Sequence, residues 1–187
     1  MEERSSAANS ASTYLNEYFN FDPVANKTED KVFGCSAILT NEEFWDAIQD
    51  GLYDTLQESW SVILFQMGLK YGTRVGQNAR DKVPDVQQAV KFLESYGLMA
   101  GWGKFKTSPF TLSMGKLTDG LKVTVEDNFF AKTGKKKKSD SPRCFFMSGL
   151  LAGIAEGLLG EGHACIERRC IANGADKCEF LITRRNA

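Results

Sequence analysis

The sequence predicts an α+β fold in which an antiparallel sheet packs against helices. Apolar residues recur at helical spacing through residues 40–97. Partial alternation of apolar and polar residues then marks two strands, in GWGKFKT and LKVTVEDNFF. A glycine-spaced apolar helix and two short strands, HACIERR and KCEFLITR, close the pattern. Helices, strands, a helix and a final hairpin, in that order, are typical of the α+β class.

Residues 1–31 are polar and rich in Ser, Ala and Asn. They are predicted to form a mobile N-terminal tail with one short helical piece around Tyr14 to Phe19. Residues 32–187 are predicted to form a single domain, because a chain of 187 residues can bury a sizeable core.

Local signals place the first helices. Thr40 and Glu43 have the form of a capping box, which predicts a helix that begins at Thr40. A second helical stretch covers residues 59–79. Pro84-Asp85 opens a third helix, and Gly97 suits its C-terminal end.

Two predicted helices carry glycine at every fourth position, which costs a helix about 1 kcal/mol per glycine relative to alanine. Such stripes predict close helix packing, either within the domain or across a dimer. The fourth helix is predicted to begin with Ser141 as N-cap and Pro142 at its first position. The stripe residues are Gly68, Gly72 and Gly76 in the second helix, and Gly149, Gly153 and Gly157 in the fourth.

Composition excludes several classes of protein. The net charge of −1 gives no general attraction to nucleic acid or to anionic membranes. No apolar run reaches 18 residues, so no membrane span is expected. The N-terminus lacks the apolar stretch of a signal peptide, so a cytoplasmic protein is expected. The basic run Lys135 to Lys138 is interpreted as a solvated, mobile loop.

Three cysteines and a glutamate near the C-terminus form a candidate metal site: Cys144, Glu167, Cys170 and Cys178. Thiolate sulfur and carboxylate oxygen are good zinc ligands, and four protein ligands make a closed, structural site. An Asn-Gly turn signal between Cys170 and Cys178 predicts a hairpin that brings the two thiols together. In a reducing compartment, cysteines point to metal or reactive thiols rather than disulfides.

Alternatives remain at this site. The thiols could be ordinary buried cysteines beside a surface glutamate. Cys165 shares a strand face with Glu167 and could replace it as the fourth ligand. His163 is the only histidine; it could bind a metal, contact a tetrapyrrole or act as acid or base, but is interpreted as an ordinary turn or strand residue.

The sequence favours a binding module over an enzyme. A single histidine leaves few ways to build a nucleophilic triad. Gly101-Trp102-Gly103 fits neither the dinucleotide nor the Walker pattern. Three Trp and thirteen Phe supply aromatic surface that could line a pocket for a flat apolar ligand.

The C-terminal third resembles the 4-vinyl reductase (V4R) domain family. The resemblance rests on Pro142-x-Cys144 at the start of a glycine-spaced helix, followed by Glu167-x-x-Cys170 and then Cys178. It implies the fold shared by vesicle-tethering subunits and nitric-oxide-sensing haem domains, and a homodimer. It also implies a structural zinc ion held by Cys144, Glu167, Cys170 and Cys178, beside a buried apolar pocket.

Three functions follow as hypotheses. The leading one is a zinc-stabilised domain that captures, delivers or senses a hydrophobic or aromatic molecule, including a tetrapyrrole. The second is a vinyl reductase or accessory factor of chlorophyll synthesis, although no signature of an electron-donating cofactor is visible. The third is an interaction protein for photosystem assembly or tethering.

Overall fold

The computed structural model describes residues 17–132 and 144–185 and divides the chain into two units, Met1–Thr40 and Asn41–Ala187. Strands β1 (Phe19–Asp22), β2 (Lys27–Asp30) and β3 (Cys35–Ala37) of the first unit form an antiparallel sheet in that order. Most of the helical piece predicted around Tyr14 lies outside the described residues, and Phe19 begins a strand. The mobility predicted for residues 1–31 stays a prediction.

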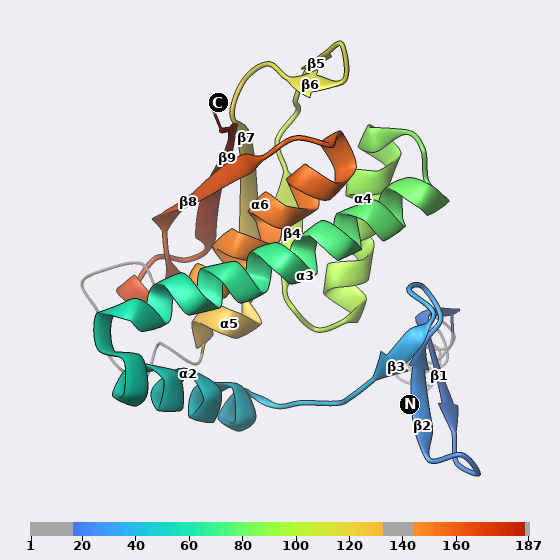
Figure 1. Cartoon of the computed structure of the whole chain (residues 1–187), viewed down its shortest axis with the longest axis vertical. Helices are drawn as coiled ribbons and strands as arrows, with labels where there is room; N and C mark the ends of the chain where they lie inside the picture. Colours follow the sequence, from blue (N-terminus) through green and yellow to red (C-terminus); the bar gives the residue numbers. More distant parts are fainter. Residues whose placement is uncertain (1–16, 133–143, 186–187) are drawn as a thin grey trace, which may run out of the picture. The chain divides into compact units, whose positions relative to one another are not determined.

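An antiparallel four-stranded sheet forms one layer of the second unit (Figure 1). Its strands are β4 (Lys104–Thr107), β7 (Leu121–Glu126), β9 (Cys178–Arg184) and β8 (His163–Arg169), in that spatial order. Every second residue along β7, and along β9 as far as Ile182, is buried, so one face of the sheet meets the core. Strands β5 (Leu112–Ser113) and β6 (Lys116–Leu117) form a separate small hairpin.

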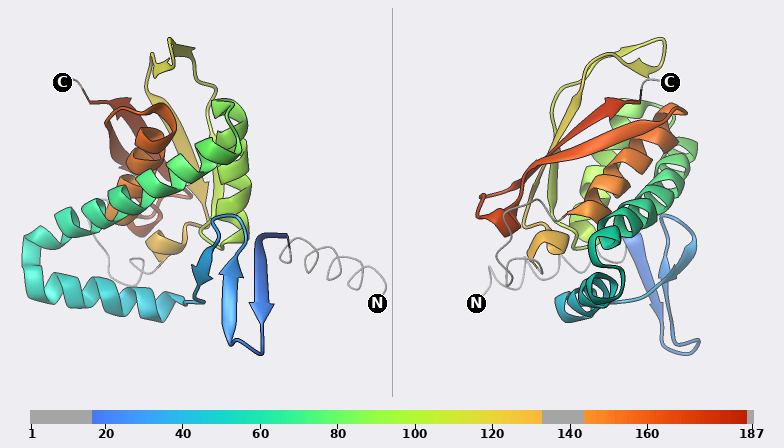
Figure 2. Two further views of the ribbon diagram at one scale, coloured as in Figure 1. Left: turned by 45° about the vertical axis from the view of Figure 1, so that its right-hand side comes forward. Right: turned by 60° about the vertical axis from the view of Figure 1, so that its left-hand side comes forward.

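The second unit also contains the helices α2 (Glu42–Leu56), α3 (Trp60–Lys82), α4 (Val86–Met99), α5 (Phe129–Lys132) and α6 (Phe145–Leu159), with one 3₁₀ turn η1 (Gln57–Ser59) before α3. Of these, α6 packs against β8 and β9, and α4 packs against β4 (Figure 2). The predicted α+β fold, an antiparallel sheet packed against helices, is confirmed.

The glycine stripes join α3 to α6. A Cβ atom on Gly68, Gly72 or Gly76 would meet backbone atoms of α6, and one on Gly149, Gly153 or Gly157 would meet backbone atoms of α3. The predicted close packing therefore occurs within the domain. Since α6 also contacts β8 and β9, it lies between α3 and the sheet (Figures 1 and 2).

Two predicted helix starts are wrong. The cap of α2 is Asn41 rather than Thr40, because the Asn41 side chain accepts a hydrogen bond from the Phe44 amide at 2.9 Å. Helix α6 begins at Phe145 with Cys144 as its N-cap, three residues later than expected. Ser141, Pro142 and the Lys135 to Lys138 run lie outside the described residues.

The main core lies between α6 and the sheet. Met147 and Leu150 of α6 and Val125 and Phe180 of the sheet are completely buried there.

Across the described parts of the chain, every helix is too short or too polar to cross a membrane.

Candidate functional site

The four residues of the predicted metal site lie together in the core. Their side chains come from the start of α6, from β8, from the residue after β8 and from the start of β9. One ligand atom from each lies within 4.8 Å of the other three, and all four residues are buried. The members are Cys144, Glu167, Cys170 and Cys178, which we call the Cys₃Glu cluster.

A hydrogen bond ties α6 to β8 inside the cluster. The backbone N–H of Cys144 donates to Oε2 of Glu167 at 3.0 Å. The other carboxylate oxygen, Oε1, is buried and has no hydrogen-bond partner among the described residues. A buried carboxylate oxygen without a donor is costly, unless a cation or another group engages it.

A β-bulge explains how Glu167 and Cys170 face the same way. Residues three apart point to opposite faces of a regular strand. The register between β8 and β9 shifts at Glu167 to Arg169, so Arg168 is an extra residue. Arg168 and Arg169 are exposed, whereas Glu167 and Cys170 are buried. The bulge therefore turns the side chains of both Glu167 and Cys170 toward Cys144.

The segment between Cys170 and Cys178 begins with a short 3₁₀ helix, η3 (Ile171–Asn173). Gly174 ends it with φ +89°, a conformation that favours glycine. The N–H of Ile171 donates to Sγ of Cys178 at 3.4 Å. This loop returns the chain so that Cys178, at the start of β9, faces the same centre.

The crowding of acidic groups raises their pKa values. Hydrogen bonds with Cys170 and Cys178, together with burial, raise the pKa of Cys144 well above its usual range. The hydrogen bond with Cys144 lowers the pKa of Cys178, but the one with Cys170 and burial outweigh it and raise that pKa to about 12. Burial raises the pKa of Glu167 to about 8. The three thiols and the carboxylate can therefore be deprotonated together only if a cation balances their negative charges.

The cluster has the dimensions of a zinc site. Tetrahedral zinc with Zn–S bonds of about 2.3 Å places sulfur atoms about 3.8 Å apart. Sγ of Cys144 lies 3.6 Å from Sγ of Cys170 and 3.8 Å from Sγ of Cys178. Three thiols and the unpartnered Oε1 of Glu167 supply four donors that zinc accepts.

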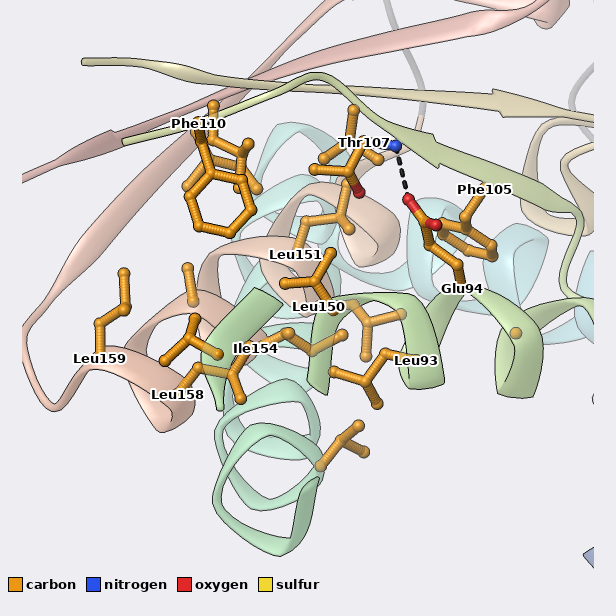
Figure 3. Close-up of a pocket in the computed structure, with 18 of the residues that line it drawn as sticks. Leu93, Glu94, Phe105, Thr107, Phe110, Leu150, Leu151, Ile154, Leu158 and Leu159 are labelled. Atoms are coloured by element: carbon orange, nitrogen blue, oxygen red, sulfur yellow. Dashed lines mark hydrogen bonds between the residues drawn. The ribbon is translucent and has the colours of Figure 1, made fainter. Parts of the chain in front are cut away.

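An apolar cavity of about 70 Å³ lies between α4, α6 and the sheet (Figure 3). A buried water needs only roughly 10–15 Å³ by the same measure, so several heavy atoms fit. Glu94 is the one charged residue among the described residues that line the cavity, and its Oε1 accepts a hydrogen bond from the Thr107 amide at 2.6 Å. Lining residues labelled in Figure 3 include Leu93, Phe105, Phe110, Leu151, Ile154 and Leu158.

Part of the chain matches the sequence model of a known protein family. Residues 121–184 match the family model of the V4R domain. The matched segment contains all four residues of the Cys₃Glu cluster and the strands that carry them. No curated protein matches the chain in sequence.

Solved structures share the fold. The phenol-responsive sensory domain of the transcription activator PoxR with phenol matches with a TM-score of 0.81 and 17% identity, covering 94% of this chain and 89% of that one. A vinyl-4-reductase family protein from Methanocaldococcus jannaschii matches with a TM-score of 0.56 and 15% identity, covering 80% and 85%.

Two further solved structures match with lower scores. A trafficking protein particle complex subunit 3 from Naegleria fowleri has a TM-score of 0.46 and 13% identity, covering 78% of this chain and 95% of that one. An H-NOX protein from S. oneidensis has a TM-score of 0.44 and 17% identity, covering 97% and 92%.

Two other sequence candidates, Cys165 and His163, lie on the same buried face of β8 as Glu167. Cys165 is buried but is not a member of the Cys₃Glu cluster. Burial raises its pKa far above the usual thiol range. His163 is fully buried, and its Nδ1 lies 2.7 Å from the Glu161 carbonyl oxygen. Neither residue lines the apolar cavity.

Asn128 and most of the cavity were not predicted from the sequence. Asn128 is completely buried, and its Nδ2 donates to Sγ of Cys144 at 3.5 Å. In the sequence, Asn128 lies between a strand and a lysine-rich run. Its contact with Cys144 of the cluster arises only when the chain folds. Val86, Val90 and Leu93 of α4 line the cavity, and a search for apolar faces opposite one another could have found it.

Proposed function

We propose that this chain is a zinc-stabilised small-molecule-binding domain that captures, delivers or senses a hydrophobic or aromatic ligand. The cavity between α4, α6 and the sheet is the observation that carries the proposal. Its one carboxylate is engaged by a backbone amide, so the ligand meets a lining of aliphatic and aromatic side chains. Such a site binds an apolar body with little demand for polar groups.

The PoxR sensory domain is phenol-responsive and its structure contains phenol, which supports a ligand of similar size here. A cavity of about 70 Å³ suits a single ring or a short aliphatic chain. A tetrapyrrole has four linked rings, so binding one would require α4 to move away from the sheet. We therefore favour a single-ring ligand over a tetrapyrrole.

Zinc has a structural role in this proposal. Cys144 would tie the start of α6 to Glu167, Cys170 and Cys178 of the terminal hairpin. Leu150, Leu151, Ile154 and Ala155 line the cavity from α6, so a fixed α6 fixes one wall of the cavity. The metal would have no direct contact with the ligand.

Ligand binding tests the proposal directly. Trp102 lines the cavity, so its fluorescence reports occupancy during titration with toluene, phenol, naphthalene and a porphyrin. We expect single-ring compounds to bind with Kd values in the micromolar range. Ala155→Phe fills the cavity and should abolish binding, whereas Ala47→Phe on the exposed part of α2 should not. No binding of any compound would contradict the proposal.

The alternatives predict other outcomes. A vinyl reductase would convert a divinyl substrate in the presence of a reductant. An assembly or tethering factor would bind a protein partner in a way that Ala155→Phe leaves unchanged.

We also propose a homodimer, which sedimentation analysis of the whole chain would show at twice the 20.8 kDa mass of one chain.

A further inference from the structure

Asn128 lies in the short link between β7 and α5, next to the Cys₃Glu cluster. Its side chain is completely buried. Nδ2 lies 3.5 Å from Sγ of Cys144, within the range of an N–H···S hydrogen bond. Neither the sequence motifs nor the family match gives this residue a role.

The surroundings determine which way the Asn128 amide points. Oδ1 accepts a hydrogen bond from the N–H of Phe130 at 3.1 Å. A backbone N–H can only donate, so the oxygen must face Phe130 and the NH₂ group must face the sulfur. The carbonyl oxygen of Asn128 accepts from Ala131 and Lys132 at 3.1 Å each, which holds the residue in place at the start of α5.

We propose that Asn128 is a positioning residue for the metal centre. Its side-chain NH₂ group donates an N–H···S hydrogen bond to the Cys144 thiolate. This inference rests on the proposed zinc site. The bond withdraws charge from the sulfur and holds its orientation toward the metal. The Ile171 amide does the same for the sulfur of Cys178. Unlike Ile171, Asn128 donates through a side chain and can be changed by substitution.

Two variants separate the sulfur contact from the helix cap. Asn128→Ser keeps an oxygen that can cap α5, but its side chain is too short to reach the sulfur. Asn128→Asp keeps the shape and the cap, but places a carboxylate against the thiolate. The matched control is Asn41→Ser, because Asn41 caps α2 through the Phe44 amide and contacts no sulfur of the cluster.

Zinc affinity and thiol reactivity of the full-length protein give the readouts. Competition with a chelator should show zinc affinity reduced about 10- to 100-fold in Asn128→Ser, and further in Asn128→Asp. Iodoacetamide followed by peptide mass spectrometry should show faster alkylation of Cys144 in the zinc-loaded variants, with little change at Cys178. Cobalt-substituted protein should show a shifted sulfur-to-cobalt charge-transfer band. Asn41→Ser should match the wild type in all three measurements.

Several results would overturn the inference. If zinc affinity and Cys144 alkylation in both Asn128 variants equal those of Asn41→Ser, then Asn128 is only a helix cap. If Asn128→Ser fails to fold, Asn128→Asp decides the matter through the same measurements. If the wild type binds no zinc, the metal centre fails and this inference fails with it, whereas Trp102 titration with toluene would still decide the ligand-binding proposal separately.

Discussion

At the scale of single residues, only one of the two carboxylate oxygens of Glu167 accepts a hydrogen bond. Oε2 is fixed by the Cys144 amide, while Oε1 points to no donor among the described residues. The donor set Cys144, Glu167, Cys170 and Cys178 could be predicted from sequence spacing and family resemblance. Asn128 could not, because its contact with Cys144 spans 16 residues and depends on how β7 and α6 pack.

Replacing a thiol of the cluster should remove the metal. In Cys144→Ser, zinc affinity should fall by more than about 100-fold, because a lost ligand costs more than a lost outer-shell partner. Cys35→Ser is the control, since Cys35 is exposed and lies outside the cluster. Zinc content after dialysis, measured by atomic emission, checks both variants. Equal zinc content in the two would contradict the assignment.

Zinc should stabilise the fold more as pH rises. In zinc-free protein, burial raises the pKa of Glu167 to about 8, so folding retains a proton there and stability falls as pH rises from about 4.5 to about 8. Zinc binds the deprotonated ligands and removes this loss. The rise in Tm caused by zinc, relative to protein with chelator, should therefore be larger at about pH 8 than at about pH 6. A rise that is the same at both pH values would contradict this expectation.

At the scale of elements, close packing of α3 on α6 was predictable, because glycine at every fourth position of a helix lets another backbone approach that face. The start of α6 was predicted three residues too early, and the β8 bulge was not predicted. The bulge was implicit in the spacing, since Glu167 and Cys170 cannot share a face of a regular strand. The cap of α2 was misplaced by one residue, because Thr40 and Asn41 are both good N-cap residues.

The α3–α6 contact predicts opposite effects for two glycine substitutions. Gly153→Ala places a Cβ against the backbone of Leu69 and Thr73, which cannot move without moving α3. Overpacking of about 1–3 kcal/mol should outweigh the helix-propensity gain of about 1 kcal/mol. Gly51→Ala meets no atom within 4 Å and should stabilise α2 by up to about 1 kcal/mol. Urea unfolding of both variants measures the two changes, and a stabilised Gly153→Ala would refute the close contact.

At the scale of the whole molecule, both described core clusters belong to the second unit. Both core clusters, with the residues packed against them, begin at Trp45 or later, and the Cys₃Glu cluster and the cavity also lie after residue 41. The sequence predicted this α+β domain from helical periodicity and strand alternation. The resemblance implied a buried apolar pocket, but not which residues line it, because the lining depends on how side chains from α4, α6 and the sheet fill the space between them.

Removing residues 1–40 should therefore leave the domain intact. We expect residues 41–187 to unfold in one cooperative transition, to retain one zinc ion and to bind toluene as the whole chain does. Calorimetry with fluorescence titration checks this result. Loss of cooperative unfolding would show that the first unit contributes to the core.

The most direct test of the metal centre is X-ray absorption at the zinc edge on the intact protein. We expect three sulfur neighbours at about 2.3 Å and one oxygen neighbour at about 2.0 Å. A shell made only of oxygen and nitrogen neighbours, or one with fewer than three sulfur atoms, would contradict the assignment of Cys144, Glu167, Cys170 and Cys178 as zinc ligands.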